Sequence, residues 1–232
     1  SMGSMFRLCS KLTSLDVSGF VTNNVVNMEG MFYDCNVLSS LDVSGFNTSN
    51  VTTMRAMFGN CNSLASLDLT GFDTSNVTSM GNMFNDCSSL TSLDLSSFNT
   101  SNATDMEQMF YQCTSLTSLD LSIFNTSNVT YMAGMFNSCS NLASLDVSGF
   151  NTSKVTDMSY IFDYMNKLQE VKLGANFSFT GDGSASCTLP TPSSTYITGA
   201  DGNWYNTAGT AFTASTVPSN VADTYYAASS LV

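Results

Sequence analysis

Six aspartates occur at a fixed period of 26 residues, and they are the side chains in the sequence best suited to binding a metal ion. On stacked strands about 4.8 Å apart their carboxylates would form a single column. Ca²⁺ binds carboxylate oxygens, so this column is a candidate calcium site. The favoured explanation of how the charge repulsion is offset is hydroxyl donors from flanking serines together with water, and partial protonation is a further alternative. The six residues are Asp16, Asp42, Asp68, Asp94, Asp120 and Asp146.

Six cysteines follow the same period, at Cys9, Cys35, Cys61, Cys87, Cys113 and Cys139. No C-x-x-C metal motif occurs among them. Stacked side chains point in the same direction rather than toward each other, which disfavours disulfides between neighbours. The seventh position of the column is Met165, an apolar residue. The column therefore predicts buried, reduced thiols, while Cys187 lies outside it.

Composition excludes several classes of function. The sequence contains no histidine, so triads that use histidine as the base are impossible, and we do not expect an enzyme. The formal net charge is −12, which argues against nucleic acid or an anionic membrane as partner. No apolar run is long enough to cross a membrane, so we expect no direct membrane insertion. No cofactor is predicted, apart from the calcium considered above.

The elements that must position these residues form a repeat, of which 87–112 is a clear copy. A period of this length is typical of solenoids. Leu90, Leu93 and Leu95 fit the L-x-x-L-x-L pattern of a strand with alternating sides. A polar turn follows. Met106, Met109 and Phe110 then have helical spacing after a potential N-cap at Thr104.

The predicted fold is an α/β solenoid with seven parallel strands over residues 1–174. It is a right-handed leucine-rich-repeat stack with the parallel β-sheet on one face and short helices on the other. Composition changes after Gly174, so 175–232 is predicted as a small, mainly-β C-terminal cap or linking module. Asp201-Gly202 predicts a hairpin turn, and a short helix is expected near Asn220. Because the chain begins inside a repeat, we interpret it as a fragment of a longer protein.

The repeat pattern MF-x-x-C-x-S-L-x-S-L-D-L-S-x-F-N-T-S-N-V-T-x-M resembles the BspA-like leucine-rich-repeat surface proteins of bacteria. It is specifically similar to the 26-residue surface-protein repeat also found in mycoplasma lipoproteins. The resemblance covers residues 2–173. It implies an extracellular, cell-surface location and a role in binding or adhesion, and it implies no catalytic residues.

A partner-binding surface is expected where the copies differ. The outward strand positions hardly vary, whereas the predicted helical positions vary and collect tyrosines, which are favoured in binding sites. The candidate partner-binding residues are Asp105, Glu107, Gln108, Tyr111, Tyr131, Tyr160 and Tyr164. The leading function is a non-catalytic adhesion module for a protein or polysaccharide on host or neighbouring cells. The alternatives are a structural stalk without its own ligand and, more weakly, a cation-binding module.

Overall fold

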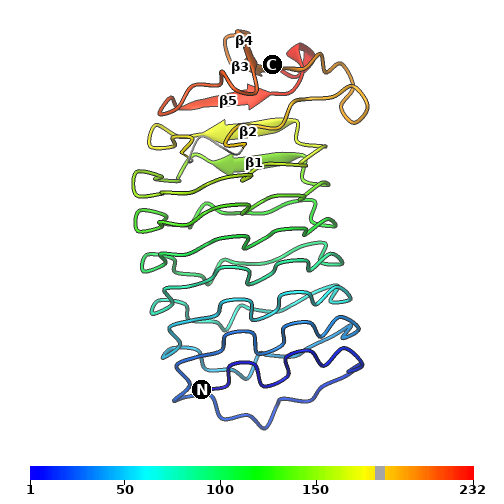
Figure 1. Ribbon diagram of the computed structural model, residues 1–232, viewed down its shortest axis with the longest axis vertical. Coiled ribbons are helices and arrows are strands. Elements are labelled where there is room, and N and C mark those ends of the chain that lie inside the picture. Colours follow the sequence, from blue (N-terminus) through cyan, green and yellow to red (C-terminus); the bar gives the residue numbers. More distant parts are fainter. Residues whose placement is uncertain (181–185) are drawn as a thin grey trace.

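The computed structural model describes residues 1–180 and 186–232. The chain winds into flat coils stacked along the long axis, with the N-terminus at one end and a compact C-terminal tail at the other (Figure 1). Parallel β-bridges join equivalent residues of neighbouring coils, and we use them to number the coils. Coil 1 precedes Asn27, and coils 2 to 7 start at Asn27, Thr53, Ser79, Asp105, Tyr131 and Asp157.

The prediction of helices on one face is wrong. In each coil the segment with helical spacing is a succession of turns. The backbone N–H of Met106 donates to Tyr131 O at 2.9 Å, and that of Phe110 donates to Met135 O at 3.0 Å, both in the next coil. Between them the Met109 N–H bonds locally to Met106 O at 3.3 Å, and the Glu107 N–H bonds to Asp105 Oδ1 at 3.0 Å. A helix would keep all these bonds within the segment, so bonding between coils excludes it.

Backbone dihedrals explain how the turns repeat. Two positions in each turn segment have φ between +52° and +64°, in the left-handed region. Gln108 and Gln112 occupy these positions in coil 5, with φ of 52° and 56°. An α-helix needs φ near −63° throughout. The apolar spacing misled the prediction because the turns bury the same residues that a helix would have buried: Met106, Met109 and Phe110 are all fully buried.

The predicted sheet of seven parallel strands is also wrong. In the described residues, only the last two leucine-containing segments form paired strands, β1 (Ser144–Val147) and β2 (Glu170–Leu173). They are parallel, with Ser144 opposite Glu170. Earlier coils keep the alternating burial without strand pairing: Leu67 and Leu69 are buried and Asp68 is exposed. Alternation reports which side faces the core, not whether neighbouring segments are hydrogen-bonded.

The tail completes a mixed five-stranded sheet in the order β1-β2-β5-β3-β4. It contributes β3 (Asn203–Asn206), β4 (Ala211–Thr213) and β5 (Asp223–Tyr226), followed by the 3₁₀ helix η1 (Ser229–Leu231). Strand β5 pairs antiparallel with β2 and so covers the edge of the last coil (Figure 1). The result is a nearly all-β protein rather than an α/β solenoid.

Two local predictions in the tail are corrected. The hairpin turn lies between β3 and β4, after Asn206, and not at Asp201-Gly202. Asp201 instead precedes β3, where its carboxylate accepts a hydrogen bond from the Tyr205 hydroxyl at 2.5 Å. Asn220 is not in a helix. It has a left-handed φ of 58° in the segment leading to β5.

The core consists of columns that run along the stack. Rings of equivalent phenylalanines from Phe6 to Phe162 stack with centroids 5.7 to 6.0 Å apart. Each buried cysteine donates to a backbone carbonyl of the preceding coil, as Cys61 does to Phe32 O at 3.2 Å. Burial raises the pKa of the Cys61 thiol to about 12. Burial is confirmed for Cys35, Cys61, Cys87, Cys113 and Cys139, whereas Cys9 of the same column is only partly buried.

Candidate functional site

The aspartate column lies on the exposed strand face, which we define as the surface of the leucine-containing segments. Each carboxylate accepts a hydrogen bond from the residue two positions later. Asp42 Oδ1 accepts from the backbone N–H of Ser44 at 3.0 Å and from its hydroxyl at 2.7 Å. The serine hydroxyl and backbone bonds lower the pKa of Asp42 below its ordinary value, although the charge of Asp16 opposes this. The serine donors considered in the sequence analysis are therefore present.

A shallow hollow of about 630 Å³ lies over the first three aspartates of the column, Asp16, Asp42 and Asp68. At the other end of the column, Asp146 forms an ion pair with Lys172, with 3.2 Å between Oδ2 and Nζ. Among the described residues, no group of three or more acidic or cysteine side chains is placed to hold a metal ion. The calcium site stays a prediction.

The variable residues lie on the opposite side of each coil, which we call the turn face. It is the surface of segments 1–9, 27–35, 53–61, 79–87, 105–113, 131–139 and 157–165. All seven candidate partner-binding residues line two adjoining hollows there. The acidic hollow, about 400 Å³, is lined by Arg55, Asp105, Glu107, Tyr131, Ala133 and Asp157. The tyrosine hollow, about 330 Å³, is lined by Gln108, Tyr111, Ala133, Gly134, Asn137, Ser159, Tyr160, Asp163 and Tyr164.

The two hollows share Ala133 and so adjoin each other, and apart from Arg55 of coil 3 all their lining residues belong to coils 5 to 7. Both are within or near the size range of small-ligand sites, about 300–1,000 Å³. The sequence placed the seven side chains on one face by their variability. The winding of the coils brings them around two adjoining hollows.

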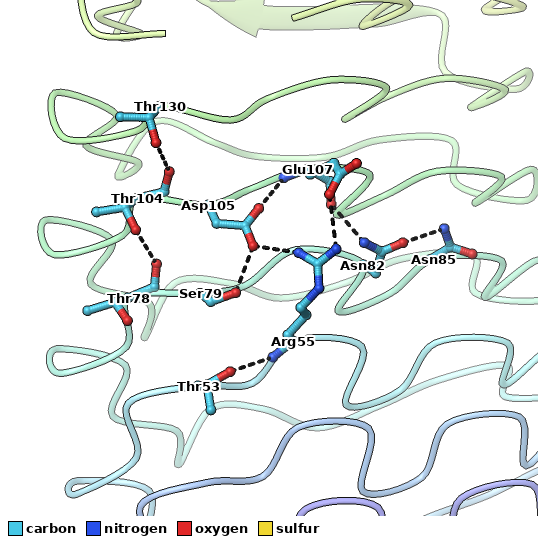
Figure 2. A network of polar contacts seen from close by, with 10 residues as sticks. All are labelled: Thr53, Arg55, Thr78, Ser79, Asn82, Asn85, Thr104, Asp105, Glu107 and Thr130. Carbon is cyan, nitrogen blue, oxygen red and sulfur yellow. Dashed lines mark hydrogen bonds and ion pairs between the residues drawn. The ribbon is translucent and has the colours of Figure 1, made fainter. Parts of the chain in front are cut away.

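Arg55 anchors the acidic hollow, and the sequence analysis did not identify it. Its Nη1 lies 2.5 Å from Asp105 Oδ2 and its Nη2 lies 3.0 Å from Glu107 Oε2, two coils away (Figure 2). The Ser79 hydroxyl donates to the same Asp105 oxygen at 2.8 Å. Partial burial by itself lowers the pKa of Arg55, but the bond to Glu107 and the charges of both carboxylates outweigh burial and raise it.

The sequence does contain a pattern that could have indicated the role of Arg55. It is the only basic residue in its repeat column, and the next residue of that column is Gly81. A side chain at position 81 would fill the path of Arg55, because an added Cβ would lie 2.4 Å from its Nη1. The pattern arginine, glycine, acid at successive copies therefore encodes a bridge across one coil.

Two tyrosines of the tyrosine hollow have a left-handed backbone conformation, which is unusual for an aromatic residue. Tyr160 and Tyr164 have φ of 60° and 58°, and they are 47% and 67% exposed. Equivalent positions in other coils hold residues such as Asn82 and Asn60, which adopt this region more easily. A bulky side chain is unfavourable at such positions, so the two exposed tyrosines are candidates for a surface function.

Each hollow also contains one carboxylate without a basic partner among the described residues, Asp157 in the acidic hollow and Asp163 in the tyrosine hollow. Asp157 Oδ1 accepts from the backbone and hydroxyl of Ser159 at 2.9 and 2.6 Å. Asp157 Oδ2 and the Asp163 carboxylate make no ion pair in the described part of the chain. The C-terminal half of the turn face is therefore aromatic and negatively charged.

No helix in the described part of the chain is long and apolar enough to cross a membrane. No curated protein and no solved structure matches the chain. One family model matches twice, over residues 1–117 and 91–179. The match agrees with the mycoplasma-type repeat in the resemblance noted above, but it does not support the more specific assignment to BspA-like leucine-rich repeats. By this match, which spans residues 1–179 and so more than half of the chain, the chain belongs to the family described as Mycoplasma protein of unknown function, DUF285.

Proposed function

We propose that the chain is a non-catalytic binding module, displayed on the cell surface, that holds a protein or polysaccharide on its turn face. The observation that carries the proposal is the gathering of all seven variable side chains around two adjoining hollows. The surface location is part of the proposal, and it is supported by the resemblance of the repeat to those of bacterial surface proteins.

Tyrosine supplies large contact area with few rotatable bonds, and it is enriched among residues that dominate binding energy. Four tyrosines line the hollows, and two of them occupy left-handed positions where a bulky side chain is unfavourable. The strand face lacks comparable variation, since its outward positions repeat Ser-Asp-Ser with small changes. The turn face is therefore the better candidate for binding a specific partner.

The test is a screen of host matrix proteins and glycans with the wild-type chain and a Tyr160→Asn/Tyr164→Asn variant. Asparagine already occupies the equivalent left-handed positions at Asn82 and Asn60, so the variant should fold. Tyr33→Asn on the same face is the matched control. We expect a ligand that is retained by the wild type and the control and is lost by the double variant.

A structural stalk is the second candidate, favoured by the uninterrupted phenylalanine column from Phe6 to Phe162. A stalk would show no ligand in the same screen. A ligand that binds equally well to the double variant would place binding on another face and contradict the proposed site.

A further inference from the structure

The chain contains two arginines, Arg7 and Arg55, and both lie on the turn face. The Arg7 guanidinium lies over the Tyr33 ring, with 4.4 Å between Cζ and the ring centroid. The Arg55 guanidinium lies between Asp105 and Glu107. The turn face thus holds guanidinium groups in two ways, on a tyrosine ring and between carboxylates.

The same receiving groups recur in the C-terminal coils without an arginine of the chain. Tyr111 occupies the repeat position of Tyr33, and Asp157 occupies that of Asp105. The positions equivalent to Arg7 and Arg55 are here taken by Asn85 and Glu107. Tyr111 and Asp157 therefore occupy repeat positions whose side chains contact an arginine elsewhere on this face, with Ser159 in place of the second carboxylate.

Charge favours a cationic ligand over a neutral or acidic one. The chain has a net charge of −12, and Asp157 and Asp163 have no ion-pair partner among the described residues. Cations are attracted to the face of an aromatic ring, and this attraction grows as they are desolvated in a hollow. A guanidinium also bonds a carboxylate through two parallel N–H groups, which an ammonium cannot do.

We propose that the two hollows bind a basic polypeptide segment. Arginine side chains would stack on Tyr131 beside Asp157 in the acidic hollow, and on Tyr111, Tyr160 and Tyr164 beside Asp163 in the tyrosine hollow. This proposal rests on the proposed binding function and names the chemistry of the partner. Two hollows that meet at Ala133 accept two neighbouring arginines of one segment.

The test uses calorimetric titration of the full chain with three probes. These are a short capped peptide with arginine at alternate positions and glycine between, the same peptide with lysine, and cellohexaose as a neutral saccharide. We expect the arginine peptide to bind more tightly than the lysine peptide, and cellohexaose not to bind. The affinity should fall with added salt because charge contributes to it.

Three pairs of substitutions distinguish a specific site from general attraction by negative charge. Asp157→Asn/Asp163→Asn changes the net charge from −12 to −10, and Asp42→Asn/Asp68→Asn on the strand face makes the same change. The first pair should lower the affinity for the arginine peptide about tenfold, and the second should change that affinity by less than about twofold. Tyr160→Asn/Tyr164→Asn, which leaves the charge unchanged, should also weaken it about tenfold.

Equal losses in both aspartate pairs, or no loss in the tyrosine pair, would overturn the proposal in favour of non-specific attraction. Binding of cellohexaose without the peptide would overturn it while leaving the proposed binding function intact. Absence of binding by all three probes would also overturn it, and the wider screen would then decide the proposed function separately. Thermal melting of each variant verifies folding, and the aspartate pairs suffice if the tyrosine pair does not fold.

Discussion

Arg55 in coil 3 forms an ion pair with Asp105 in coil 5, with 2.5 Å between Nη1 and Oδ2. The side chain passes over Gly81 in coil 4, where a Cβ would lie 2.4 Å from Nη1 and 2.7 Å from Asp105 Oδ1. Figure 2 shows the guanidinium reaching both Asp105 and Glu107. Repeat proteins are held together mostly by contacts between nearest neighbours. This bridge adds a contact between next-nearest coils.

Gly81→Ala should destabilise the chain through this bridge. Alanine by itself restricts the unfolded chain and would stabilise by roughly 0.4–1 kcal/mol. Displacement of Arg55 from both carboxylates should outweigh that gain, although partly exposed pairs contribute only up to about 1 kcal/mol each. Urea denaturation of the single variant measures the net change.

A double-mutant cycle isolates the cause of the Gly81 effect. In an Arg55→Ala background the clash with Nη1 is gone. The Asp105 carboxylate, released from the arginine, can then move away from position 81, so Gly81→Ala should become neutral or stabilising. The change of sign between the two backgrounds is the expected result. Destabilisation of equal size in both would mean that the backbone, not the bridge, requires glycine.

Ala56→Gly should stabilise the chain. Ala56 has a φ of 53°, in the left-handed region that costs a residue with a Cβ roughly 1–2 kcal/mol. Glycine removes that strain and loses part of the gain to unfolded-state entropy, so a net gain of roughly 0.5–1 kcal/mol is expected. Ala65→Gly, at an exposed position outside the left-handed set, is the control and should not stabilise. Chemical denaturation compares the two.

The contribution of the aspartate column to stability should fall at acid pH. The hydroxyl and backbone bonds from Ser44 hold the pKa of Asp42 below its ordinary value of 3.8. A depressed pKa contributes stability that is present above 3.8 and is lost as pH falls through the lower folded value. NMR titration should show a higher pKa of Asp42 in Ser44→Ala than in the wild type. Ser40→Ala, in the same hollow, should leave it unchanged.

Native thiols should resist modification. Burial raises the pKa of Cys35 to about 11 and that of Cys61 to about 12. Because the thiolate is the reactive form, both should stay unlabelled by a thiol reagent at pH 8 until the chain is unfolded, whereas half-buried Cys9 should react. A raised pKa contributes stability that is present below the ordinary value of 9.0 and is lost toward pH 11–12. Labelling of Cys61 in the native state would contradict the packing.

The sequence predicted the inward residues correctly and the secondary structure wrongly, and the two outcomes have one explanation. Met106, Met109 and Phe110 are buried as their spacing indicates. That spacing describes which side chains share a face, and a chain of turns with two left-handed residues satisfies it as well as a helix does. The choice between them depends on where the backbone hydrogen bonds go. Here alternate N–H groups bond to the next coil.

By itself the sequence determined the period, the buried columns of phenylalanine, methionine and cysteine, and the variable positions that became the candidate site. Each of these follows from identity or difference between copies 26 residues apart. Only the tertiary structure decided how the coils bond, that β5 of the tail pairs with β2 of the last coil, and that Arg55 spans the gap left by Gly81. Such contacts join residues that are far apart in the chain, so their formation depends on the pitch and winding of the stacked coils rather than on any local pattern.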